Sequence, residues 1–233
     1  MTLLASDYDD TFDKYIDKNI NQVNEFMKNN LFVIATGRSY LDFKRAQDLY
    51  NIRCNYIIIN HGASIVKNGI DIYNVYIDDL VKDKIIDDLN SCKIIEKIAY
   101  SKLDSNVDFN KNSLTKIHIK CIDVISAEKL YDLLLNKYSE YINIYFVGHG
   151  KSLEIVSKNV DKSVAIKYVA EKEKINLKNI YTIGNGYSDI QMIKCFNGFA
   201  VTNAIEEIKR NCIKEYNGVY ELIENIIETR SNN

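Results

Sequence analysis

Thr-Leu-Leu-Ala-Ser-Asp-Tyr-Asp-Asp-Thr-Phe, residues 2–12, is the stretch of the sequence that decides the fold. Leu3–Ala5 is a short apolar run without charge, as a strand buried on both faces requires. Asp7, Asp9 and Asp10 then place three carboxylates within four residues. Because such dense negative charge repels itself, we expect a positive partner there, and a bound cation would serve. Open α/β sheets bind ligands just beyond the carboxyl ends of their strands, so this acidic tip is a candidate site. The alternative is an ordinary surface turn, since Asp-Asp-Thr also suits turns and helix caps.

Length and composition are typical of a globular protein. The 233 residues, 46% hydrophobic and 27% charged, fit one large domain or a core with an inserted module. Thirty basic residues against thirty-two acidic ones give a net charge of -2, which argues against a nucleic-acid partner. No apolar run approaches the ~20 residues of a membrane helix, and the sequence enters a strand without the features of a signal peptide. We therefore expect a cytoplasmic protein with no membrane partner.

The cysteines support the same location. Their number is odd, they are widely spaced, and none forms a C-x-x-C pair, which favours reduced thiols over a disulfide or zinc framework. They are Cys54, Cys92, Cys121, Cys195 and Cys212.

Strand and helix patterns alternate at both ends of the chain, which predicts an α/β fold with a Rossmann-like parallel sheet and right-handed crossovers. Apolar runs predict buried strands, and apolar residues at helical spacing, such as Ile20, Val23, Phe26 and Met27, predict helices. Ser39 is a good N-cap for the second helix. The predicted strands after the first are 31–35, 56–59, 180–183 and 198–201; the predicted helices are 19–29, 39–50, 163–173, 189–196, 204–212 and 219–229.

The middle of the chain has a different pattern. Residues 64–73 form a predicted hairpin around the turn Asn68-Gly69. Helices 79–89 and 127–138 and strands 94–101, 115–121, 142–147 and 153–156 are then predicted. Residues 115–120 alternate strictly, so one face of that strand should be wet, as in an antiparallel sheet. We predict a core domain of residues 1–77 and 157–233 and an inserted α+β cap domain of residues 78–156, whose loosest connection is Asp104–Ser113.

Polar residues follow each predicted core strand, and in a parallel sheet all of these ends lie along one edge. Carboxylates, a hydroxyl group, a lysine and an Asn/Asp pair are suited to phosphoryl transfer, which needs a nucleophile, cation ligands and positive charge. The residues are Asp7, Asp9, Asp10, Thr36, Arg38, Lys162, Asn185 and Asp189.

Asp7-Tyr8-Asp9-Asp10-Thr11 matches the D-x-D-x-T signature of the haloacid dehalogenase-like phosphatases, and the chain resembles that superfamily over nearly its whole length. Thr36, Lys162 and Gly184–Asp189 follow in the order of the superfamily's second, third and fourth motifs. The insert stands where that superfamily carries a type C2 cap. The chain is similar to the Cof-type branch, because Leu153-Glu154-Ile155 precedes the lysine and Asn203-Ala204 follows the last core strand at that branch's spacing. The insert is short for that branch and nearer in size to the caps of small phosphoglycolate- and sucrose-phosphatase relatives.

The resemblance implies a role for each motif. Asp7 would attack phosphorus and form an aspartyl phosphate, and Asp9 would protonate the leaving oxygen and later take a proton from water. Mg²⁺ would be bound by Asp7, the backbone carbonyl of Asp9, Asn185 and Asp189. Thr36 would hydrogen-bond a phosphoryl oxygen, although a helix cap also explains it. Lys162 would neutralise the phosphate and Asp7 together, although a lone lysine is ordinarily a solvated surface charge.

The fourth motif departs from the family pattern. The usual Gly-Asp-x-x-Asn-Asp is replaced by Gly184-Asn185-Gly186-Tyr187-Ser188-Asp189, which removes one negative charge. We expect weaker metal binding or direct coordination by Asp189. The alternative is a chain that has lost its activity.

Further substrate contacts are predicted beside the motifs. Gly37 and Arg38 follow Thr36, His61 stands in a Gly-Ala context where relatives often carry Asn, and His149 lies between two glycines of a cap loop. A helix surface explains Arg38 nearly as well, and a solvent-exposed turn explains His149 equally well. His118 is interpreted as an ordinary strand residue, and Asp10 has no assigned role.

These features predict a Mg²⁺-dependent phosphatase that hydrolyses a small phosphorylated metabolite, such as a sugar phosphate, under a closing cap. Three alternatives are a phosphosugar mutase on the same scaffold, a receiver-type signalling domain and a catalytically impaired binding protein. The spacing of the first motif on one strand and the large insert argue against the receiver domain. The sequence indicates neither the physiological substrate nor the oligomeric state.

Overall fold

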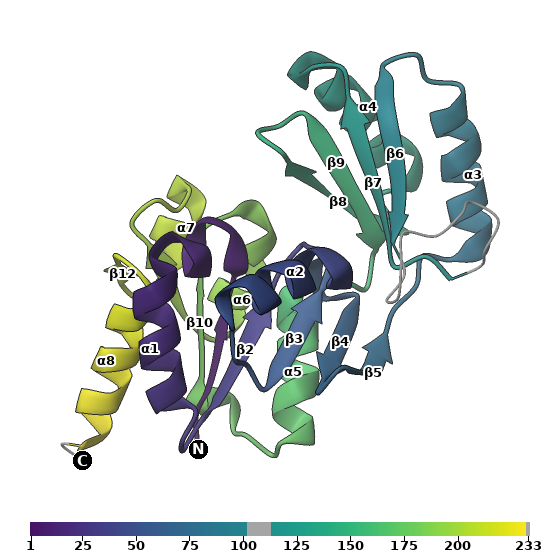
Figure 1. The fold of residues 1–233 in the computed structure, drawn as a ribbon. Coiled ribbons are helices and arrows are strands. Elements are labelled where there is room, and N and C mark those ends of the chain that lie inside the picture. The colour runs from purple at the N-terminus through teal and green to yellow at the C-terminus, as the bar shows by residue number, and fades with distance from the viewer. Residues whose placement is uncertain (102–112, 232–233) are drawn as a thin grey trace.

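The computed structural model describes residues 1–101 and 113–231, which form two sheets with separate hydrophobic cores (Figure 1). The larger sheet has eight strands in the order β12-β11-β10-β1-β2-β3-β4-β5. Its strands are β1 (Leu3–Ser6), β2 (Leu31–Ala35), β3 (Tyr56–Ile59), β4 (Ser64–Lys67), β5 (Ile70–Asn74), β10 (Ile180–Gly184), β11 (Asn197–Val201) and β12 (Glu215–Tyr216). The prediction of an α/β fold with a large parallel sheet is confirmed.

β1 is the central strand of this sheet and is paired in parallel with β2 on one side and β10 on the other. Ser6 is level with Ile34 of β2 and with Ile183 of β10, so the three strands end at the same height. The chain extends the sheet from β1 to β3 in one direction and from β10 to β12 in the other. The edge between β1 and β10 is therefore the topological switch point, where α/β sheets bind their ligands.

Helices cover both faces of the large sheet. On one face, α1 (Ile16–Phe26), α2 (Tyr40–Tyr50) and α8 (Val219–Ser231) pack against alternate residues of the strands. On the other face lie α5 (Lys162–Lys172), α6 (Ile190–Cys195) and α7 (Glu206–Asn211). Because β1 is buried on both faces, its sequence is an uninterrupted apolar run, as the sequence predicts.

The predicted hairpin is present as β4 and β5. Asn68 and Gly69 form its turn with φ of 51° and 76°, the left-handed values that a two-residue turn of this kind requires. β4 runs antiparallel to β3 and closes that side of the parallel part of the sheet.

The smaller sheet is antiparallel, in the order β6-β7-β9-β8, and lies apart from the large sheet in Figure 1. Its strands are β6 (Ile95–Ser101), β7 (Lys116–Cys121), β8 (Ile142–Val147) and β9 (Ser152–Ser157). Two helices, α3 (Asp79–Asn90) and α4 (Val124–Tyr138), cover one face, where Ile117 and Ile119 are buried. The predicted order of helix, strand, strand, helix, strand, strand is confirmed. We propose that the two sheets are the cores of two domains, residues 1–77 with 157–233 and residues 78–156.

Some boundaries differ from the prediction. α1 begins at Ile16 rather than at residue 19, because Asn19 is a buried interior residue of the helix that donates to the carbonyl of Phe12 and accepts from the amide of Tyr220. α7 spans only Glu206–Asn211, and β12 was not predicted because a two-residue strand leaves no pattern. A turn over Tyr187–Asp189 precedes α6. The predicted loose connection Asp104–Ser113 falls almost entirely on residues 102–112, outside the described residues.

Within the described parts of the chain, no helix has both the length and the apolar character that membrane crossing demands.

Candidate active site

The ends of three neighbouring strands bring the predicted residues to one edge of the large sheet. Asp7 follows β1, and its amide donates to the carbonyl of Ile183 at 3.0 Å. Thr36 follows β2, and its amide donates to the carbonyl of Ile58 at 2.8 Å. Asn185 follows β10. The backbone ladder of the sheet thus fixes the positions of the first, second and fourth motifs relative to each other.

Lys162 is delivered to this edge by the start of α5. Asp161 caps the helix, accepting from the amides of Ser163 and Val164 at 2.6 and 3.1 Å. Gly62, with φ of 109°, lies so close that a Cβ there would be 2.3 Å from the Asp161 carbonyl oxygen. This contact leaves no room for a side chain between the loop after β3 and the beginning of the helix.

The Lys162 ammonium group lies between two carboxylates. Its Nζ donates to Asp7 Oδ1 at 2.6 Å and to Asp189 Oδ1 at 2.7 Å, and the lysine side chain is only 1% exposed. The second oxygen of Asp189 accepts from the amides of Asn185 and Gly186, each at 2.9 Å. Both oxygens of Asp189 are therefore engaged by the protein, whereas Asp7 lines the cavity described below.

The electrostatics of this triad are unbalanced, because two buried carboxylates share one cation. Burial and the neighbouring Asp189 carboxylate raise the pKa of Asp7 to about 7, despite the opposing effect of Lys162. Burial alone would lower the pKa of Lys162, but Asp189 and Asp7 outweigh it and raise the pKa. Lys162 is thus held in its charged form beside Asp7, whose pKa is raised to about 7.

Asp9 has a separate partner. The Arg38 guanidinium group binds its carboxylate through Nε at 3.0 and 3.1 Å and through a terminal nitrogen at 2.6 Å. The same guanidinium lies over the ring of Tyr8, 4.7 Å from its centroid. Asp10 follows with a left-handed φ of 56°, and Asn203 donates to its carbonyl at 2.9 Å. Asp9 is thus paired with Arg38 and Asp7 with Lys162, while both carboxylates line the same cavity.

The loop after β2 contributes Thr36 and Gly37. The Thr36 hydroxyl oxygen accepts from the Arg38 amide at 3.1 Å, which leaves its proton for another acceptor. A Cβ on Gly37 would lie 2.5 Å from the His61 ring, so only glycine fits beside that imidazole. The imidazole of His61, in the turn that follows β3, therefore limits the residue at position 37 to glycine.

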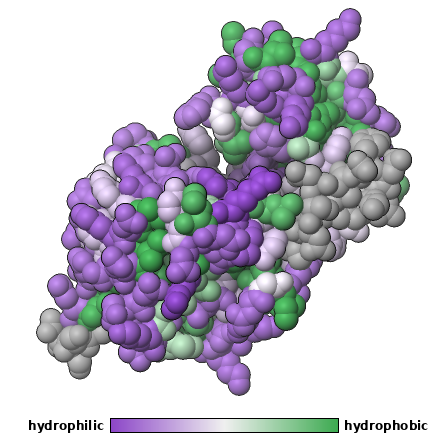
Figure 2. Space-filling model, viewed as in Figure 1, coloured by the Kyte–Doolittle hydropathy of each residue, from purple (hydrophilic) through white to green (hydrophobic). Residues whose placement is uncertain are grey.

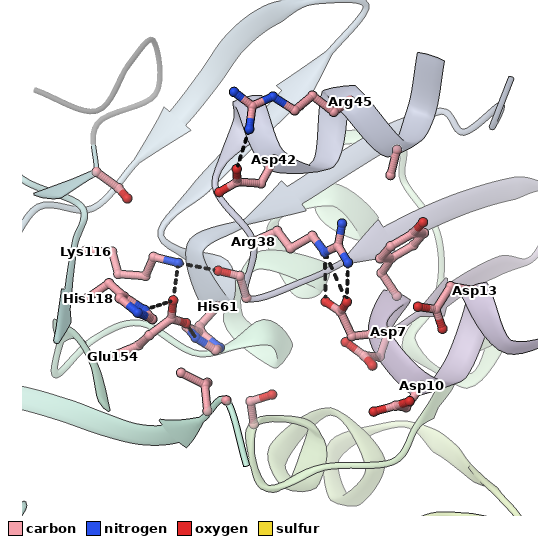
Figure 3. A pocket seen from close by; sticks show the side chains of 18 of the residues that line it. Asp7, Asp10, Asp13, Arg38, Asp42, Arg45, His61, Lys116, His118 and Glu154 are labelled. Atoms are coloured by element: carbon pink, nitrogen blue, oxygen red, sulfur yellow. Dashed lines mark hydrogen bonds and ion pairs between the residues drawn. The ribbon is translucent and has the colours of Figure 1, made fainter. Parts of the chain in front are cut away.

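A cavity of about 1150 Å³ extends from these residues to the smaller sheet, β6-β7-β9-β8, which we call the cap sheet. On the face shown in Figure 2, strongly hydrophilic residues lie between the two lobes of the molecule. Figure 3 shows Asp7 and Arg38 on one side of the cavity and a group of four cap and core residues on the other. The charged and polar lining residues are Asp7, Asp9, Asp10, Asp13, Arg38, Asp42, Arg45, His61, Ser101, Lys116, His118, His149, Glu154, Asn185 and Ser188.

That group of four is a buried carboxylate with three nitrogen partners, and we call it the Glu154 cluster: Glu154, Lys116, His118 and His61. Lys116 donates to Glu154 at 2.6 Å and to the Gly37 carbonyl at 2.6 Å, and His118 and His61 contact the carboxylate at 3.1 and 2.5 Å. Burial alone would raise the pKa of Glu154, but its partners lower it well below 4.5. Burial lowers the pKa of His61, so this imidazole donates to Glu154 as a neutral group.

The Glu154 cluster also joins cap to core. His61 and Gly37 belong to the core, whereas the other members of the contact network belong to β7 and β9 of the cap. His61 also stacks on Tyr145 of β8, with ring centroids 4.4 Å apart, and Asn60 donates to Thr115 at 3.1 Å. The expectation of a wet face on β7 is wrong for Lys116, which is 3% exposed because these contacts enclose it.

Replacing Glu154 with Gln is expected to lower the free energy of unfolding by about 3–5 kcal/mol at pH 7, because it leaves the buried Lys116 ammonium without its carboxylate. The stability that Glu154 contributes is complete above its ordinary pKa of 4.5 and is lost as the pH falls below that value, since the unfolded chain then binds the proton first. Urea denaturation of both proteins at pH 7 and pH 4 measures the difference. A difference in the free energy of unfolding between the two proteins that is equal at pH 7 and pH 4, or larger at pH 4, would contradict this prediction.

The oxygen donors at the β1–β10 edge suit a Mg²⁺ ion in kind. Asp7, Asp9 and Asn185 line one cavity, and the carboxylate of Asp7, the backbone carbonyl of Asp9 and the side-chain amide of Asn185 are hard oxygen donors of the kind that Mg²⁺ prefers. Among residues 1–101 and 113–231, no three His, Cys, Asp or Glu side chains gather as a metal-binding group. The set therefore fits Mg²⁺ with one carboxylate and two neutral oxygens, a weakly charged version of such a site.

The structure brings together Asp7, Lys162 and Asp189, and places Asp9, Arg38, His61, His149 and Asn185 around the same cavity. His118 is a residue of strand β7, as the sequence indicates, and its side chain also lines the cavity. The sequence alone predicts no functional role for Lys116 or Glu154. The available signals were the strict alternation of residues 115–120 and a carboxylate inside the apolar run Leu153-Glu154-Ile155.

Comparison with known proteins identifies the family. The model of the haloacid dehalogenase-like hydrolases matches residues 4–111 and 96–219. A proposed phosphatase of Buchnera aphidicola subsp. Schizaphis graminum is 26% identical over 90% of this chain and 87% of its own length. An uncharacterised protein of Mycoplasma capricolum is 27% identical over 77% of this chain and 78% of its own. The solved structure of a proposed HAD/COF-like hydrolase from Plasmodium vivax shares the fold with a TM-score of 0.84 at 19% identity, covering 98% of this chain and 96% of that one. The chain belongs to the haloacid dehalogenase-like hydrolase family.

Proposed function

We propose that this hydrolase is a Mg²⁺-dependent phosphatase that cleaves a small phosphorylated metabolite through an aspartyl phosphate on Asp7. The observation that carries the proposal is the buried Lys162 ammonium group, 2.6 Å from Asp7 and 2.7 Å from Asp189 at the switch point of the sheet. A carboxylate can attack a negatively charged phosphoryl group only where positive charge offsets their repulsion. The relatives named as proposed phosphatases support the same reaction.

Each residue has a distinct task in the proposed reaction. An Asp7 oxygen forms a bond to phosphorus while the bond from phosphorus to the leaving oxygen breaks. Asp9 must first take up a proton from solvent and loosen its ion pair with Arg38. It then gives that proton to the leaving oxygen, and later takes a proton from the water that hydrolyses the aspartyl phosphate. Thr36 donates its hydroxyl proton to a phosphoryl oxygen, and Lys162 offsets the charge of the phosphoryl group. Asp189 holds the lysine in place rather than touching substrate.

Mg²⁺ would be held by the Asp7 carboxylate, the Asp9 carbonyl and the Asn185 amide oxygen, and would supply positive charge against the phosphoryl oxygens. Direct coordination by Asp189, the other possibility that the sequence raises, is less favourable, because its side chain is 1% exposed and its oxygens already accept from Lys162 and two backbone amides. We therefore favour Asn185 as the fourth-motif ligand.

The test is the release of phosphate from p-nitrophenyl phosphate, measured with Mg²⁺ and with EDTA. We expect turnover that depends on Mg²⁺ and that falls by a factor on the order of 10³ or more in Asp7→Asn, since the nucleophile is lost. Asp17→Asn, an exposed substitution in α1, is the matched control and should leave turnover unchanged. Undiminished turnover in Asp7→Asn would refute the proposal.

Asn185 favours a second candidate, a catalytically impaired protein that binds phosphorylated ligands, because the amide replaces a carboxylate beside Asp7. Absence of turnover by the wild-type protein at saturating Mg²⁺, with retained binding of inorganic phosphate, would favour it.

Asn185→Asp should restore the missing charge and tighten Mg²⁺ binding by roughly one to two orders of magnitude, since a second carboxylate joins the ligands. Calorimetric titration of the protein with MgCl₂ gives the affinity without relying on activity. Ser188→Asp, at a neighbouring cavity residue, controls for added charge alone. An unchanged affinity in Asn185→Asp would remove Asn185 from the ligand set.

A further inference from the structure

One row of residues crosses the cap sheet on the side that faces the cavity. Ala99 of β6 is paired with His118 of β7, His118 with Glu154 of β9, and Glu154 with Tyr145 of β8. Ala99, His118 and Glu154 line the cavity, and Tyr145 stacks on His61 of the core. The cap therefore presents this row to whatever part of a substrate extends away from Asp7.

Glu154 determines how His118 carries its proton. The carboxylate is ionised, because its partners lower its pKa well below the ordinary value, and an ionised carboxylate only accepts hydrogen bonds. The contact at 3.1 Å between His118 Nδ1 and Glu154 Oε1 therefore requires a proton on Nδ1. In the neutral imidazole, Nε2 is then an acceptor without a proton.

The Nε2 edge of the His118 ring is not used in the contact with Glu154, and His118 lines the cavity. The His118 side chain is 33% exposed, in contrast to 4% for Lys116 and 9% for Glu154 in the same cluster. Within residues 1–101 and 113–231, Glu154 is the hydrogen-bond partner of His118, and Nε2 has none. Ser101, a hydroxyl that both donates and accepts, lines the same part of the cap.

We propose that His118 is a specificity-determining residue that accepts a hydrogen bond from a hydroxyl group of the leaving alcohol, with Glu154 as its positioning residue. This rests on the proposed phosphatase function and narrows its substrates to phosphate esters of polyhydroxylated alcohols, such as sugar phosphates. With Nδ1 donating to Glu154, an Nε2 that carries no proton can accept from a hydroxyl group but not from an anionic oxygen, because two acceptors cannot share a hydrogen bond. The Glu154 contact to Lys116, and through it to the Gly37 carbonyl, ties this recognition to the loop that carries Thr36.

The test compares two kinds of substrate in one enzyme. p-Nitrophenyl phosphate has no hydroxyl on its leaving group, whereas a panel of hexose and pentose phosphates has several. His118→Asn retains a donor that can reach Glu154 but removes the ring edge at the cavity. Lys120→Ala, two residues along the same face of β7 and outside the cavity lining, is the control.

We expect His118→Asn to raise KM for the best sugar phosphate so that kcat/KM falls roughly tenfold, the loss of about one hydrogen bond. For p-nitrophenyl phosphate kcat/KM should stay within about twofold of wild type, and Lys120→Ala should leave both unchanged. Equal losses on both substrates would indicate a structural role and overturn the proposal, as would no loss on either. Hydrolysis of p-nitrophenyl phosphate by the wild type without hydrolysis of any sugar phosphate would also overturn it. If the wild type hydrolyses neither, the proposed function itself fails.

Discussion

Lys162→Met is expected to lower the free energy of unfolding by about 3–5 kcal/mol and to abolish phosphate release. The substitution keeps a long apolar side chain but leaves Asp7 and Asp189 buried side by side without the cation between them. Their repulsion is largest when both are ionised. The loss of stability should therefore be greatest at pH 8 and should shrink as the pH is lowered, because Asp7, whose pKa is already raised to about 7, takes up a proton.

Urea denaturation in EDTA at pH 8 and pH 6 measures this effect in the protein free of divalent metal. Lys167→Met is the matched control, since Lys167 lies on the exposed side of the same helix, 58% exposed and 4.0 Å from Glu171. We expect that control to change stability by less than about 0.5 kcal/mol. Equal losses in the two variants would show that the buried ion triad contributes nothing specific.

Asp9→Asn is expected to lower kcat by about 10²- to 10⁴-fold, because the amide can neither protonate the leaving oxygen nor deprotonate the attacking water. The loss should be larger for an alkyl phosphate than for p-nitrophenyl phosphate, whose leaving oxygen needs less help from an acid. If the second step suffers more than the first, rapid-quench experiments will show a burst of p-nitrophenol before slow turnover.

Asp10→Asn provides the comparison for Asp9. Both carboxylates line the cavity, but Arg38 binds only Asp9. We expect Asp10→Asn to retain most of the activity. A loss of kcat in Asp10→Asn as large as that in Asp9→Asn would contradict the assignment of the proton transfers to Asp9.

Much of the fold follows from local sequence because its main signals are local. Uninterrupted apolar runs specify β1, β2 and β3, since a parallel strand is buried on both faces. Ser39 specifies the start of α2, where its hydroxyl accepts from the amide of Asp42. The start of α1 was misplaced because Asn19, polar in sequence, is buried by partners in distant segments. Two-residue β12 depends entirely on its neighbour β11.

In the candidate site, too, local sequence predicts some of the residue contacts and not others. Asp7, Thr36 and Asn185 could be predicted to meet, because parallel strands end at a common edge whatever their side chains. The Glu154 cluster could not, because its members come from β7, β9 and the loop after β3, and each looks ordinary alone. Their meeting depends on the register of an antiparallel sheet and on how the cap sits over the core, neither of which a local pattern contains.

Gly62 shows how far such constraints extend beyond the chemistry. It has no functional group, yet the carbonyl of Asp161 fills the place of its Cβ, so any larger residue must push the start of α5 away. In a deep mutational scan for growth or turnover, substitutions at Gly62 should therefore be as damaging as substitutions at Asp7. The scan alone would not distinguish this glycine, which only provides space, from a residue that takes part in the reaction.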